Sequence, residues 1–133
     1  MASNIIHHNI ALEIRDDRTI DSIQEEFAKE FPYLKLEFFT RTNSIANPNF
    51  KKIVKHNSKF IRECRTIHNN GTINILPNMS IATLEQNFKT EFGLSVQVLR
   101  KSGKVWLETT LTNNWSLAEQ NRQGEELSMG HSG

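Results

Sequence analysis

Cys64 and His68 lie four residues apart, a spacing that can place two zinc ligands on one face of a helix. Two ligands do not make a zinc site. The other histidines that would have to complete it, His7, His8 and His56, are at distances that the sequence does not define. We therefore expect no metal site. Cys64, the single cysteine, is expected to be a small buried apolar residue.

Asp16 and Asp17 form a carboxylate pair of the kind that acid-base catalysis uses. They fall in a turn before a predicted helix, where acids favour the amino-terminal dipole and make turn hydrogen bonds. The sequence contains no glycine-rich phosphate loop, nucleophile elbow or nucleotide fingerprint. We expect no catalytic residue and no cofactor. An enzyme whose site no linear motif reveals stays an alternative.

Positive charge is concentrated between Arg41 and Arg65, where seven Lys or Arg stand against one acid, Glu63. The apolar spacing there predicts an amphipathic helix over about 48–67, starting at Pro48, with one cationic face. Such a face could follow phosphates or an acidic partner, or simply be solvated. The candidates for contact with nucleic acid or an acidic partner are Lys51, Lys52, Lys55, Lys59 and Arg62.

An internal repeat sets the expected architecture, because residues 11–41 recur as residues 72–101 with one extra residue at Pro32-Tyr33 in the first copy. Each copy reads β-α-β. Thr19 or Ser80 begins the helix, and Pro32 or Gly93 ends it. The helical stripes that should meet in one core are Ile20, Ile23, Phe27 and Phe31 in the first copy, and Ile81, Leu84, Phe88 and Phe92 in the second.

The predicted fold class is α+β: duplicated β-α-β units in a mostly antiparallel sheet with two helices on one face, a ferredoxin-like arrangement, plus an additional hairpin strand. A pair of sheets, or a domain-swapped dimer, is the alternative. Residues 1–122 should form one domain. Ser116 and Glu119 have capping-box spacing and predict one or two helical turns, and residues 123–133 are expected to be a disordered tail.

The predicted hairpin turns at Ser102-Gly103 with Lys101 opposite Lys104. When pairs are counted outward from this turn, Leu99 lies opposite Trp106 on the face away from the helices, and Phe39 should point to the same face. An apolar patch on that face calls for a covering partner. The predicted partner-binding residues are Phe39, Leu99 and Trp106, and the partner is another protein or a second copy in a homodimer.

Composition narrows the function class without choosing a function. The net charge of the 133-residue chain is +1, so it is neither basic nor acidic throughout. The start of the sequence lacks the basic segment and following apolar run of a secretion signal, and no apolar stretch is long enough to span a membrane. We expect a cytoplasmic, non-catalytic protein-binding or assembly domain, with nucleic-acid binding as the alternative.

The segment EFGLSVQVLRKSGKVWLETT, followed by NNWSLAEQN, resembles a group of small uncharacterised bacterial proteins. These share a phenylalanine-glycine-leucine strand start, an RKSG turn and a tryptophan-leucine-glutamate-threonine strand. The resemblance covers about the last 55 residues well and the first copy more loosely. It implies kinship and fold, and brings no substrate, cofactor or catalytic residue with it.

Overall fold

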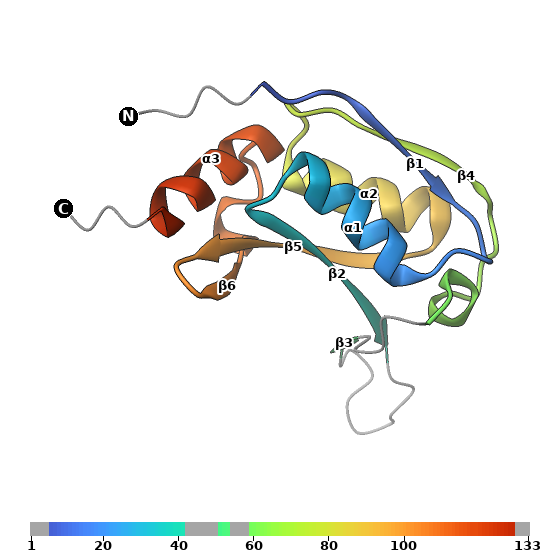
Figure 1. Cartoon of the computed structure of the whole chain (residues 1–133). Helices are drawn as coiled ribbons and strands as arrows, with labels where there is room; N and C mark the ends of the chain where they lie inside the picture. Colours follow the sequence, from blue (N-terminus) through green and yellow to red (C-terminus); the bar gives the residue numbers. More distant parts are fainter. Residues whose placement is uncertain (1–5, 42–50, 54–58, 130–133) are drawn as a thin grey trace.

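The computed structural model describes residues 6–41, 51–53 and 59–129 (Figure 1). Three α-helices, six strands and two short 3-10 helices occur within these ranges. In chain order they are β1 (Ile10–Ile14), α1 (Ile20–Glu30), β2 (Leu34–Arg41), β3 (Lys51–Ile53), η1 (Ile61–Cys64), β4 (Gly71–Ile75), α2 (Ile81–Phe92), β5 (Ser95–Ser102), β6 (Val105–Glu108), η2 (Thr110–Thr112) and α3 (Leu117–Ser128).

The described strands form two antiparallel sheets. β1 pairs with β4 as a two-stranded ribbon, and the larger sheet has the order β3-β2-β5-β6. Figure 1 shows α1 and α2 between the ribbon and the larger sheet. The α+β class, the two helices on one face and the extra hairpin strand are confirmed, consistent with a ferredoxin-like arrangement. The strands are divided as in the pair-of-sheets alternative, because β2 and β5 pair directly and leave β1 and β4 to pair with each other.

One hydrophobic core joins the two copies of the repeat. Phe27 from α1 and Phe88 from α2 are fully buried members of the same cluster. The ring of Phe38 in β2 meets that of Phe88 edge to face, with centroids 6.2 Å apart. The ribbon closes the core from the other side, since Leu12, Ile14, Ile73 and Ile75 are buried while the residues between them face solvent. The prediction that the two copies share an interior is confirmed.

Local sequence accounts for the helix ends. The Thr19 hydroxyl accepts the Ser22 N–H at 3.2 Å, and the Ser80 hydroxyl accepts the Thr83 N–H at 3.1 Å, so each first turn has a side-chain cap. Gly93 closes α2 with φ of +64°, a left-handed conformation that glycine adopts without strain. The capped starts and this end agree with the sequence prediction.

The two halves of the chain resemble each other in structure beyond the predicted β-α-β units. Isolated bridges join Thr19 to Phe60 in the first half and Ser80 to Ser116 in the second. Each half therefore continues past its β-α-β unit through a hairpin strand to a second helix start; we call residues 10–65 the first unit and residues 71–128 the second unit. Equivalent backbone hydrogen bonds occur in both units. The Ile20 N–H donates to the Lys59 carbonyl in the first unit, as the Ile81 N–H does to the Trp115 carbonyl in the second. The Ile61 N–H donates to the Arg18 carbonyl, as the Leu117 N–H does to the Met79 carbonyl.

The predicted helix over 48–67 is wrong in the residues described there. Lys51–Ile53 forms strand β3, paired with β2, and only Ile61–Cys64 is helical, as the single 3-10 turn η1. Ile61 and Cys64 are buried at i, i+3 spacing, which a 3-10 turn and an α-helix share. Pairing with β2 is a long-range contact that local spacing does not encode. Residue 48 and Lys55 lie outside the described residues.

The predicted tail is partly wrong as well. α3 runs from Leu117 to Ser128, three turns in place of one or two, after a cap in which the Ser116 hydroxyl accepts the Glu119 N–H at 3.1 Å. Gly124 is buried against Tyr33, in the turn before β2, and Arg100 of β5, which explains how a polar segment stays helical. Within the described ranges, no helix combines the length and the apolar character needed to cross a bilayer.

Candidate functional site

The β5–β6 hairpin differs in register from its sequence prediction. Ser102 pairs with Val105 across a two-residue turn, so Trp106 lies opposite Lys101 rather than opposite Leu99. The turn is formed by Gly103, with φ of +63°, and Lys104. Glycine at the first turn position and an ordinary negative φ at the second describe a type II′ turn, the form that matches strand twist. The predicted turn at Ser102-Gly103 is therefore wrong by one position.

The three predicted partner-binding residues share a face but do not form one patch. The register change moves β6 by two residues, so Trp106 keeps its face and becomes a diagonal neighbour of Leu99. Phe39 lies opposite Ser95, four residues or about 13 Å along β5 from Leu99. The polar pair Glu37 and Gln97 separates them. Phe39 is half-buried.

The largest run of exposed apolar side chains lies on β6 itself. Val105, Trp106 and Leu107 expose 56%, 38% and 41% of their surface. β6 is the last strand of the sheet on this side. On the face away from the helices, the Lys35 ammonium lies 5.8 Å from the Trp106 ring centre and forms an ion pair with Glu37 at 3.0 Å. Trp106 was predicted as a partner-binding residue, whereas Val105 and Leu107 were not.

The end of α3 lies over this hairpin on the other face. The Ser128 hydroxyl accepts the Gly103 N–H at 3.2 Å, and the Tyr33 hydroxyl lies 3.3 Å from the Met129 sulfur. Met129 is therefore on the β2 side of the helix. Leu127, the residue before Ser128, is 49% exposed.

The basic residues proposed for nucleic acid or an acidic partner are not gathered on one helix. Lys51 and Lys52 belong to β3, Lys59 precedes η1, and Arg62 is in η1. The Arg62 guanidinium lies 4.2 Å from the ring centre of Phe60. The described residues thus do not form the continuous cationic helical face on which that hypothesis depended.

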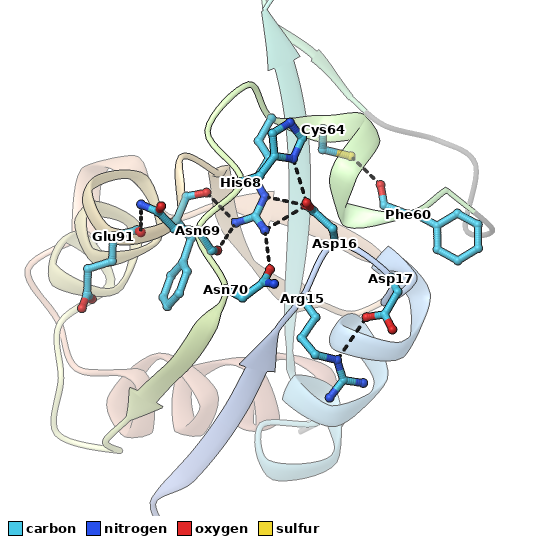
Figure 2. Close-up of polar contacts among 11 residues, drawn as sticks. Arg15, Asp16, Asp17, Phe60, Cys64, His68, Asn69, Asn70 and Glu91 are labelled. Atoms are coloured by element: carbon cyan, nitrogen blue, oxygen red, sulfur yellow. Dashed lines mark hydrogen bonds and ion pairs between the residues drawn. The ribbon is translucent and has the colours of Figure 1, made fainter.

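A polar cluster surrounds the buried guanidinium of Arg65, the residue after η1. Figure 2 labels its partners Asp16, Asn69 and Asn70, together with His68. Arg65 Nη2 donates to the Asp16 carboxylate at 2.9 Å, and Arg65 Nη1 donates to the backbone carbonyls of Asn69 at 2.6 Å and Phe92 at 3.0 Å. His68 Nδ1 lies 2.8 Å from the other Asp16 oxygen. Arg65 thereby joins the β1–α1 loop, the segment before β4 and the end of α2.

The electrostatics of this cluster favour a structural role. Partial burial raises the pKa of Asp16, but hydrogen bonds from Arg65 and His68 outweigh it and leave the pKa below its usual value. The carboxylate is therefore ionised and fully engaged at neutral pH. Burial raises the pKa of the Cys64 thiol, which keeps it protonated and a poor nucleophile. Within the described ranges, no three metal-ligating side chains gather closely enough to hold an ion.

Sequence reasoning had no signal for this cluster. Arg65 is 49 residues from Asp16 in the sequence and His68 is 52 residues from it, and no motif links the three. Asp16 was assigned only to a turn. Asp16 does lie in that turn, but its carboxylate binds Arg65 and His68, which long-range folding brings to it.

Comparisons of the chain with protein-family models, with curated proteins and with solved structures returned no match. The function therefore has to be inferred from the geometry of the chain itself.

Proposed function

We propose that this chain is a non-catalytic protein-binding or assembly domain that recognises its partner along strand β6. The observation that carries the proposal is the run Val105, Trp106 and Leu107, exposed on an edge strand of the larger sheet. A strand at a sheet edge offers N–H and C=O groups for pairing, and proteins that avoid such pairing place charges or proline there. An added strand would bury all three side chains.

The polar groups of the molecule support the non-catalytic part of the proposal. The Arg65 cluster uses its charges to hold three segments together, and its carboxylate already binds Arg65 and His68. The single thiol is buried and protonated. These groups stabilise the frame on which β6 is presented.

A photo-crosslinking amino acid in place of Leu107 tests the proposal in cells that express the protein. We expect a covalent adduct with a protein, because a partner on β6 brings its backbone within a few ångströms of this side chain. The matched control is the same amino acid at Asn74, an exposed strand position on the ribbon. Absence of a protein adduct at 107, or equal yields at 107 and 74, would contradict the proposal.

A further inference from the structure

The hairpin geometry defines which backbone groups of β6 are free for pairing. Ser102 and Val105 close a two-residue turn, so they exchange hydrogen bonds with each other. Hydrogen-bonded and non-hydrogen-bonded pairs alternate along an antiparallel ladder. Val105 and Leu107 therefore direct their N–H and C=O groups toward β5, while Trp106 and Glu108 direct theirs to the outer edge.

From this edge we infer that the partner of β6 is a second copy of the same chain, paired antiparallel about a two-fold axis at Trp106. The inference rests on the proposed function and names its partner. In this register Trp106 faces Trp106 of the second copy, and the two exchange hydrogen bonds through their outward groups. Val105 faces Leu107 of the second copy, and Lys104 faces Glu108 of the second copy.

Charge complementarity selects this register and this partner. The exposed residues Lys104 and Glu108 flank the apolar run, so a two-fold axis at Trp106 creates two opposite-charge pairs and encloses the apolar side chains between them. A two-fold axis at Leu107 also matches outward groups, but it places Trp106 against Glu108 and Lys104 against Thr110. That register has no charge pairs and leaves an acid against an aromatic ring.

The surroundings of β6 are arranged for the same contact. The end of α3, where the Ser128 hydroxyl accepts the Gly103 N–H, lies on the helix-bearing face of the hairpin, and its Leu127 is half exposed. On the opposite face, Lys35 lies over Trp106 at cation–π distance. Pairing through β6 would join two four-stranded sheets into one continuous sheet.

The test is light scattering after size-exclusion chromatography of the full chain over a range of concentrations. We expect a species of twice the 15.3 kDa chain mass. Lys104→Glu and Glu108→Lys should each raise the dimer dissociation constant by about tenfold, because each converts two attractive pairs into two repulsive ones. The double variant Lys104→Glu/Glu108→Lys restores both pairs with reversed sign, and its dissociation constant should return to within about threefold of the original.

The double variant makes the result independent of folding defects, since it contains both single changes. A strictly monomeric wild-type chain at about 100 µM overturns the inference, because that concentration corresponds to an affinity of only about 5.5 kcal/mol. A dimer that ignores the single reversals, or that the double variant fails to restore, overturns it too. If the chain is monomeric but the residue-107 crosslinker captures a different protein, this inference fails and the proposed function stands. If neither contact is found, both fail.

Discussion

At the scale of single residues, Arg65 is the side chain that joins the β1–α1 loop, the segment before β4 and the end of α2. Its guanidinium is fully buried, yet it meets one carboxylate, two backbone carbonyls and the Asn70 side chain. A buried cation is tolerated only with such complete pairing. A planar guanidinium supplies the required number of donors in fixed directions, which lysine does not.

Arg65→Ala should lower the free energy of unfolding by about 2–4 kcal/mol, because it leaves the Asp16 carboxylate with His68 as its one remaining partner and the Phe92 carbonyl without its donor. Urea denaturation followed by circular dichroism measures the change. Arg15→Ala is the matched control: Arg15 is on the same loop, but its ion pairs are exposed, so a loss of no more than about 1 kcal/mol is expected. Equal losses of unfolding free energy for the two variants would show that Arg65 does not hold these loops together.

The lowered pKa of Asp16 also predicts how stability depends on pH. A carboxylate whose pKa is lower in the folded state stabilises the protein above the unfolded pKa, near 3.8, and loses that contribution as the pH falls through the folded pKa. Asp16→Asn should therefore be less stable than wild type at pH 5. Its unfolding midpoint should approach that of wild type as the pH is lowered below about 4. A difference that persists undiminished to the lowest pH at which both fold would contradict the assignment.

At the scale of elements, the sequence predicted what local chemistry determines. Thr19, Ser80 and Gly93 mark helix ends through bonds made within one turn, and alternation marks the buried faces of β2 and β5. β3 and the hairpin register were mispredicted because both depend on pairing with a distant or neighbouring strand. The length of α3 was missed because its buried face carries polar and small residues, Gln120, Asn121 and Gly124, which have no apolar periodicity.

The candidate site was predictable in part for the same reason. Trp106 stands out as a large aromatic residue, and because side chains alternate along a strand, the two-residue error in register left it on the correct face. The exposure of Val105 and Leu107 follows from β6 being the outermost strand, and strand order is a property of the whole sheet. A glycine and lysine turn could have indicated the register, because type II′ turns favour glycine at their first central position.

Gly124→Ala tests how closely α3 packs on the sheet. An alanine Cβ would lie 2.8 Å from the Tyr33 Cβ and 3.0 Å from its carbonyl oxygen. Alanine is favoured over glycine inside a helix by about 1 kcal/mol, but overpacking against backbone costs about 1–3 kcal/mol and should prevail. We expect a lower thermal midpoint for this variant. Gln123→Ala, beside it on the same helix and less buried, should be nearly neutral. A stabilised Gly124→Ala protein would mean that α3 is not docked as described.

At the scale of the whole molecule, the two units hold each other's helix ends. Arg65, near the end of the first unit, donates to Phe92 at the end of α2. Its equivalent position in the second unit is Asn121, whose side-chain oxygen accepts the Tyr33 N–H just after α1. The two units thus exchange contacts as well as sharing a core, so neither unit keeps its helix-to-strand junction without the other.

This exchange predicts that the two units unfold together. Both tryptophans, Trp106 and Trp115, belong to the second unit, so their fluorescence reports on that unit alone. Ile23→Val removes one methylene from the buried face of α1 in the first unit and should cost about 1 kcal/mol, or about 4 °C in the thermal midpoint. The fluorescence midpoint should fall by as much as the circular dichroism midpoint. Glu25→Ala, on the exposed side of α1, should move neither. A fluorescence transition that stays in place while circular dichroism shifts would mean that the units fold separately, since a shared core cannot lose stability in one half only.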